Sequence, residues 1–212
     1  LQNLGSQVPT LQGPGAAALP NAASPLLSAP VVLPRELRTD EIAALLASAD
    51  EAVRLPMLLL FSGVDVQEAI ALHGTDVDLE KNTLRIRGSS ARELHLSEPL
   101  RTLLARDANS NDRLLWFSAA DATEDAIDAQ ILSAAYDARL SSPAEVDAKC
   151  LRHTFIAFLV RQGIRFSDLQ RIVGALPAQT LAGYALLSPT TSVQARDAID
   201  PVLPAIRQAT VV

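Results

Sequence analysis

The sequence has little of several residue types, and each shortage excludes a class of protein. Cys150 is the only cysteine among 212 residues, which excludes an internal disulfide and a cysteine-based zinc site. No stretch reaches the roughly 18 uninterrupted apolar residues that a membrane-spanning helix needs. The apolar N-terminus lacks a basic region, so no secretory signal is indicated. A reducing, cytoplasmic compartment is therefore expected.

Aromatic residues are also scarce, at 4% of the sequence against 49% for all hydrophobic residues. The core must therefore consist mainly of Leu, Ala, Val and Ile, in an amount sufficient for a globular body of well over a hundred residues. Ala- and Leu-rich segments with few β-branched runs favour helices. His73 and His95 have no partner at metal-ligand spacing, and neither a metal nor a cofactor is predicted.

Basic residues are outnumbered, which argues against a protein that simply coats nucleic acid. The net charge is −6. Residues 148–187 nevertheless hold five cations and one acid, Asp168, a local +4 that leaves −10 for the remainder. A local basic face on an acidic body is therefore predicted, and its cations are Lys149, Arg152, Arg161, Arg165 and Arg171.

Composition divides the chain into three parts. Residues 1–34 are rich in Pro, Gly, Ala and Ser and show no period, as in a linker or arm. Such a segment suggests that a further N-terminal part lies upstream. Residues 35–190 form the predicted folded domain, and residues 191–212 form a C-terminal segment that could serve as an oligomerisation tail.

Most of the domain has helical patterns, with capping residues at several predicted starts. We expect Thr39, Thr123 and Ser167 to be N-caps and Pro177 to be the first residue of its helix. "RLPMLLLFSG" predicts a buried helix with Pro56 in its first turn. "LRHTFIAFLVRQG" predicts another helix, which Gly163 ends.

A single β region interrupts the helices. "DVDL", "NTLRIRG" and "RELHLS" have strand character, and the last two are joined by a tight connection at Gly88-Ser89-Ser90. We predict a small antiparallel sheet here, in a fold that is otherwise mainly α.

The order of these motifs resembles the catalytic domain of tyrosine recombinases (phage integrases). "LLLFSGVDVQEAIAL" is followed by the hairpin, then by "CLRHTF", and then by "VGALPAQTLAGY", without any need for gaps. The resemblance covers about residues 35–190. It implies a mainly α fold with a three-stranded antiparallel sheet. It also implies chemistry in which a tyrosine attacks a DNA phosphodiester while cationic donors hold the phosphate oxygens.

Four residues match functional positions of that family. Arg152 stands at the second arginine, Lys149 at a position that takes His or Lys, and Tyr184 at the nucleophile. His153 matches a histidine whose role in the family is partly structural. Read without the resemblance, His153 is a hydrogen-bonded structural residue, and Tyr184 packs its ring and satisfies its hydroxyl.

Three family positions are substituted: the first arginine is Asp65, the hairpin lysine is Ser89, and the histidine after "VG" is Ala175. An acid in place of a cation reverses the sign of the interaction with the phosphate, whose size is about 4 kcal/mol at an effective dielectric near 20. Loss of the general acid removes roughly 10²–10⁴-fold in rate. Arg92 lies near the lysine position, but its pKa makes it a poor proton donor. As an acid at a helix start, Asp65 suits the helix dipole, and it could also pair with Arg152 and fill the phosphate pocket.

The sequence therefore favours a catalytically degenerate recombinase-like domain that binds DNA or a recombinase partner in recombination, integration or repair. Two alternatives stay open. One is an active site-specific recombinase that uses Tyr184, and the other is a protein-interaction module without DNA binding. A homo-oligomer is possible in each case.

Overall fold

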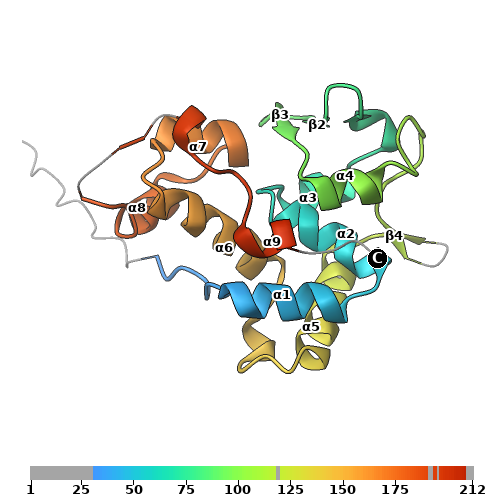
Figure 1. Cartoon of the computed structure of the whole chain (residues 1–212), viewed down its shortest axis with the longest axis horizontal. Coiled ribbons are helices and arrows are strands. Elements are labelled where there is room, and N and C mark those ends of the chain that lie inside the picture. The colour runs from blue at the N-terminus through green and yellow to red at the C-terminus, as the bar shows by residue number, and fades with distance from the viewer. Residues whose placement is uncertain (1–30, 118–119, 191–192, 195, 209–212) are drawn as a thin grey trace, which may run out of the picture.

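The chain is mainly α-helical, as predicted (Figure 1). The structure is a computed structural model that describes residues 31–117, 120–190, 193–194 and 196–208. Its helices are α1 (Thr39–Ser48), α2 (Glu51–Leu60), α3 (Val66–Ile70), α4 (Glu98–Leu104), α5 (Glu124–Asp137), α6 (Ala148–Arg161), α7 (Phe166–Val173), α8 (Ala178–Ala185) and α9 (Pro204–Gln208). Short 3₁₀ turns occur at η1 (Gly74–Asp76), η2 (Pro143–Glu145) and η3 (Arg196–Ala198).

The predicted antiparallel sheet is present, with strands β1 (Val77–Asp78), β2 (Thr83–Ile86) and β3 (Arg92–His95) in that order. Leu84 on β2 lies opposite both Val77 and Leu94, and all three are buried on the core face. A second, two-stranded sheet of β4 (Trp116–Phe117) and β5 (Ala120–Asp121) was not predicted. Strands of two residues are too short to show a hydrophobic alternation.

Helix α2 is the centre of the core and packs against α3, α4, α5 and α6. Every residue from Leu55 to Phe61 is buried, in agreement with the predicted buried helix. The predicted place of Pro56 in the first turn is wrong, because the helix begins earlier, at Glu51, after the N-cap Asp50. Pro56 therefore lies inside the helix.

Of the predicted caps, only Thr123 is confirmed: its Oγ1 accepts a hydrogen bond from the Ala126 N–H at 3.2 Å. Helix α1 is capped differently, because the Glu41 carboxylate accepts from the backbone N–H of Arg38, which places Thr39 inside the helix. Helix α7 likewise begins one residue before Ser167, and Pro177 is the N-cap of α8 rather than its first residue. These boundary errors are one or two residues long.

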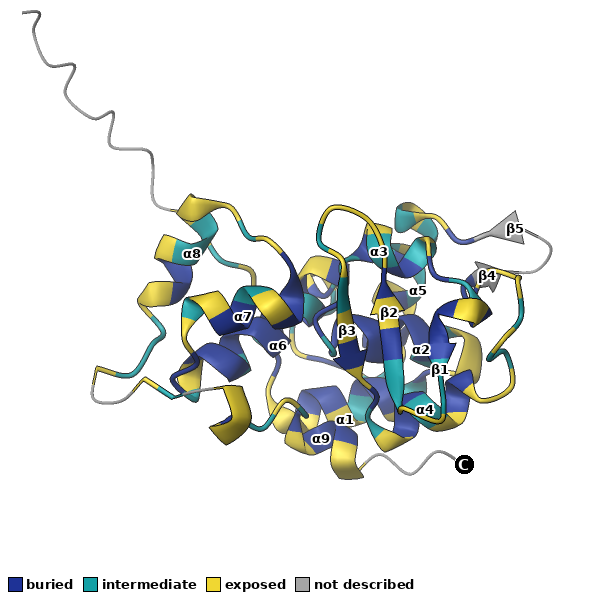
Figure 2. Ribbon diagram, turned by 90° about the horizontal axis from the view of Figure 1, so that it is seen from above, coloured by how far each residue is buried: buried dark blue, intermediate teal, exposed yellow. Residues whose placement is uncertain are grey.

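The two ends of the described chain pack on the same helical body (Figure 2). Helix α9, in the predicted C-terminal segment, packs against α1 and α4 of its own chain. At the other end, Val31–Pro34 lie beside α6 and α8, where they help to line a pocket. Residues 1–30 of the predicted arm lie outside the described residues. No helix in the described ranges has the length and apolar character that a membrane crossing requires.

Candidate functional site

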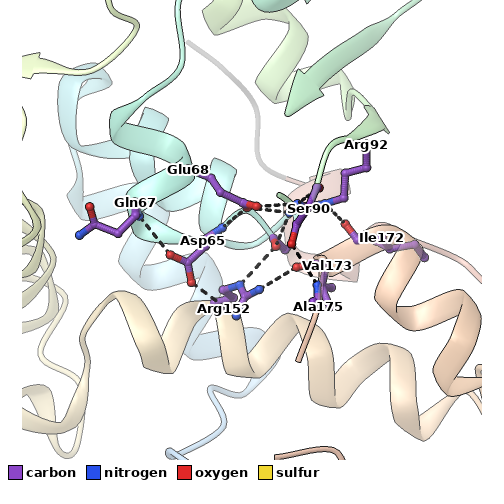
Figure 3. Close-up of polar contacts among 10 residues, drawn as sticks. Asp65, Gln67, Glu68, Ser90, Arg92, Arg152, Ile172, Val173 and Ala175 are labelled. Carbon is purple, nitrogen blue, oxygen red and sulfur yellow. Dashed lines mark hydrogen bonds and ion pairs between the residues drawn. The ribbon is translucent and has the colours of Figure 1, made fainter. Parts of the chain in front are cut away.

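Arg152 occupies the junction of α3, α6 and α7 (Figure 3). Its Nε donates to the Gly63 carbonyl at 3.3 Å, and its Nη2 donates to the Val173 carbonyl at 2.7 Å. Its Nη1 lies 3.6 Å from the Oδ2 of Asp65, so the ion pair considered from the sequence forms. Burial lowers the pKa of Arg152, whose side chain is 18% exposed, whereas the Asp65 charge raises it.

Asp65 has two roles at this junction. Its Oδ1 accepts from the Gln67 N–H at 3.1 Å, so it is the N-cap of α3, while its Oδ2 faces Arg152. Both readings of Asp65 offered by the sequence are therefore correct together. Its side chain remains 43% exposed, and solvent screening weakens the pair accordingly.

A second ion pair lies beside the first and is more deeply buried. Arg92 on β3 donates through Nη1 and Nη2 to the two carboxylate oxygens of Glu68 at 2.6 and 2.7 Å. The Arg92 side chain is 6% exposed and that of Glu68 is 18% exposed. Glu68 also accepts from the backbone N–H of Asp65. The pair therefore joins the hairpin to α3.

Both arginines also bind the C-terminal end of α7. Arg92 Nε donates to the Ile172 carbonyl at 2.7 Å, next to the Val173 carbonyl that Arg152 binds. Cations stabilise this end of a helix, where the last carbonyls have no helical partner. Gly174 follows with φ +83, and a Cβ there would lie 3.0 Å from Arg92 Nη1. Glycine thus permits the close approach.

Tyr184 and His153 form a buried pair on the side of α6 that faces α8. The tyrosine hydroxyl lies 2.8 Å from His153 Nδ1, and both residues are 3% exposed. Burial raises the pKa of Tyr184 to about 12 and lowers the pKa of His153. At neutral pH the phenol therefore keeps its proton and the imidazole is neutral. We assign the hydroxyl as donor and Nδ1 as acceptor, which satisfies the buried hydroxyl hydrogen.

One pocket of about 230 Å³ gathers most of the residues singled out in the sequence. Asp65, Lys149, Arg152, His153 and Tyr184 line it together, although they lie on α3, α6 and α8 or just before them. The other two substituted positions lie outside this lining. The backbone N–H of Ala175 donates to Ser90 Oγ at 3.4 Å, and Ser89 beside it is exposed on the hairpin turn.

The predicted basic residues do not form one continuous face. Arg161 is ion-paired with Glu36 at 2.7 Å, and Arg171 with Asp168 at 3.0 Å. Arg161 also follows Arg152 by nine positions, about two and a half helical turns, so it points to the opposite side of α6. Lys149 and Arg165 are exposed, and no ion pair within the described ranges engages either of them.

Sequence reasoning missed Glu68 and considered Arg92 only as a substitute for the hairpin lysine. A signal for Glu68 was present, because Asp65 followed three residues later by Glu68 is a capping-box pattern. In the described part of the chain, no group of three or more His, Cys, Asp or Glu residues is placed to hold a metal ion.

No protein-family model and no curated protein match the sequence. Solved structures do match. XerA recombinase is 24% identical with a TM-score of 0.62, over 72% of this chain and 60% of that one. The chain has a fold like that of a tyrosine-recombinase catalytic domain. It shares 18% identity with the integrase from mycobacterium phage Brujita, with a TM-score of 0.57, over 80% of this chain and 63% of the integrase.

A third similar structure was determined with DNA. The Tn1549 transposon integrase in complex with circular intermediate DNA is 15% identical, with a TM-score of 0.55, over 76% of this chain and 63% of that one. The chain thus spans less than two thirds of the length of these recombinase and integrase chains. At such identities the similarity establishes the fold.

Proposed function

We propose that this chain is a recombinase-like DNA-binding domain that does not cleave DNA and acts as a binding or accessory component in recombination or integration. The observation that carries the proposal is the Asp65–Arg152 ion pair, at 3.6 Å, in the pocket that also contains Tyr184. A carboxylate in that place repels a phosphate instead of binding it.

The charges around the pocket support an absence of cleavage. Stabilising a phosphoryl transition state takes several fixed cations at the oxygens where negative charge develops. Here Asp65 opposes Arg152, and the nearby Arg92 has both Nη atoms bound to Glu68. Ser89, at the position of the family's general acid, has no proton that it could release near neutral pH.

The state of Tyr184 supports the same conclusion. A phenol attacks as phenolate, and burial holds the pKa of Tyr184 near 12. The hydroxyl already donates to His153, and the side chain is only 3% exposed. Cleavage would require Tyr184 to leave this position and lose its proton, with no charged base bonded to it among the described residues.

The DNA-binding part of the proposal is supported by the fold and by two exposed cations, Lys149 and Arg165. The test is a salt titration of duplex binding, followed by fluorescence anisotropy. Each phosphate contact contributes about −0.9 to the log–log slope, so Lys149→Ala and Arg165→Ala should each flatten it by about one.

Arg161→Ala is the matched control, because Arg161 is paired with Glu36 on the far side of α6. It should leave the slope unchanged. Absence of binding even near roughly 50 mM salt would refute DNA binding. The net charge of −6 and the two paired arginines would then favour a protein-interaction module.

A further inference from the structure

A second cavity, of about 160 Å³, lies between the helical body and the C-terminal segment. None of its lining residues also lines the pocket that contains Tyr184. The body supplies an apolar floor that is buried throughout and drawn from α2, β3, α6 and α7 or the residue just after: Phe61, Leu94, Phe155 and Ile172. The cavity is therefore a separate space with its own lining.

The C-terminal segment covers this cavity. Ile199, Val202 and Ile206 line it from the turn η3 to helix α9. Between them, Asp200 is held by Gln162 on the body: the Gln162 Nε2 donates to the Asp200 carbonyl and the Asp200 N–H donates to Gln162 Oε1, both at 2.9 Å. Helix α9 then packs against α1 and α4 (Figure 2). The cover is thus apolar and is fixed to the body on both sides of the cavity.

One polar group in the lining has no partner. Ser97 lines the cavity, and its Oγ is buried without a hydrogen bond among the described residues. Ser97 is the N-cap of α4, yet its side chain makes no capping bond. The other serine of the lining, Ser62, already donates to the Leu58 carbonyl at 2.8 Å. Buried hydroxyls normally have a partner, and rotation about χ1 can turn the Ser97 hydroxyl towards a molecule in the cavity.

The size and the lining define what fits. An engineered cavity of about 150 Å³ lined by Leu, Ile and Phe binds benzene. This cavity has a similar volume and the same kinds of side chain, and the rings of Phe61 and Phe155 favour offset or edge-to-face contact with another ring. His95, Arg196 and Asp197 complete the lining and are exposed, so the cavity reaches the protein surface and a ligand has a way in.

From these features we infer that the cavity binds one small neutral molecule with a single aromatic ring and one hydrogen-bonding group, as in phenol. The ring packs between the apolar floor and the C-terminal cover, and the polar group binds the Ser97 hydroxyl. The site is distinct from the one discussed above, and the inference does not depend on DNA binding.

The experiment is a titration of the isotopically labelled chain with phenol and, separately, with toluene, followed by NMR of the Leu94 and Ile206 methyl groups. The two probes have nearly the same size and differ in the hydroxyl. Saturable shifts are expected, with a Kd of roughly 1 mM or lower for phenol. In Ser97→Ala the ratio of phenol affinity to toluene affinity should fall about fivefold, because the hydrogen bond is lost. Ser62→Ala is the matched control and should leave the ratio unchanged.

A filled cavity gives a second test. Val202→Phe places a larger side chain in the lining and should weaken binding of both probes at least about tenfold. Val193→Phe is its control, because Val193 is in the same segment but is 65% exposed. The inference would be overturned if neither probe gave saturable shifts at the cavity, which would leave water as its only occupant. An unchanged affinity ratio in Ser97→Ala would overturn it equally, even if Val202→Phe failed to fold.

Discussion

Replacing Glu68 by Gln tests whether the Arg92–Glu68 ion pair holds the hairpin, α3 and α7 together. The substitution keeps the shape of the side chain but removes the countercharge of Arg92, which is 6% exposed. Removing one partner of a buried ion pair costs about 3–5 kcal/mol. Gln retains one carbonyl acceptor and Glu68 is 18% exposed, so we expect a cost at or just below the lower end of that range, about 2–3 kcal/mol.

Urea denaturation followed by circular dichroism measures this change in the free energy of unfolding. For a chain of this length, each kcal/mol corresponds to about 2–4 °C in Tm. Glu93→Gln is the matched control, because Glu93 is an exposed strand residue opposite Arg85, and its loss should change stability by less than about 0.5 kcal/mol. If Glu68→Gln changed the free energy of unfolding as little as the control does, the Arg92–Glu68 ion pair would not stabilise the fold as proposed.

Three further predictions concern buried groups. Burial lowers the pKa of His153, so as the pH falls the imidazole takes up a proton in the unfolded chain before it does so in the folded chain. The free energy of unfolding should therefore fall as the pH drops below about 6.5. Urea titrations at pH 7 and pH 5.5 should show a smaller loss of stability for His153→Gln than for the unmodified chain. Gly63→Ala should destabilise by at least about 2 kcal/mol, since φ is +86 and the new Cβ would lie 2.7 Å from Phe155, and a Tm within about 2 °C of the unmodified chain would contradict this. Cys150 is fully buried, and burial raises its pKa to about 11, so its thiol should react with a disulfide reagent only after denaturant is added.

Local patterns predicted the fold well where the deciding contacts lie close in sequence. Thr123 caps its helix through a residue three positions away, and the hairpin follows from alternation around Gly88. Thr39 and Ser167 failed as caps because the backbone N–H of Arg38 found a carboxylate acceptor in Glu41, and because α7 starts at Phe166. Several side chains can satisfy a helix end, and packing selects among them.

The site was predictable only in part, because several of its contacts join residues that are far apart in the sequence. The resemblance to tyrosine recombinases implied a shared site for Asp65, Arg152 and Tyr184, and in the structure all three line one pocket. The bond between Tyr184 and His153 joins positions 31 residues apart, and the bond from Arg92 to Ile172 on α7 joins positions 80 residues apart. Contacts of this kind depend on how α6, α7 and the hairpin pack against one another. Local sequence patterns do not predict that packing.

The most direct measurement is a covalent trap. The chain is incubated with a pool of nicked duplexes of random sequence, which would hold any phosphotyrosyl intermediate, and adducts are resolved on a denaturing gel beside a cleaving integrase of the same fold. We predict bound but intact DNA and no adduct, because Tyr184 is protonated and Asp65 opposes Arg152. A covalent adduct that disappears in Tyr184→Phe would contradict this conclusion and identify the chain as an active recombinase.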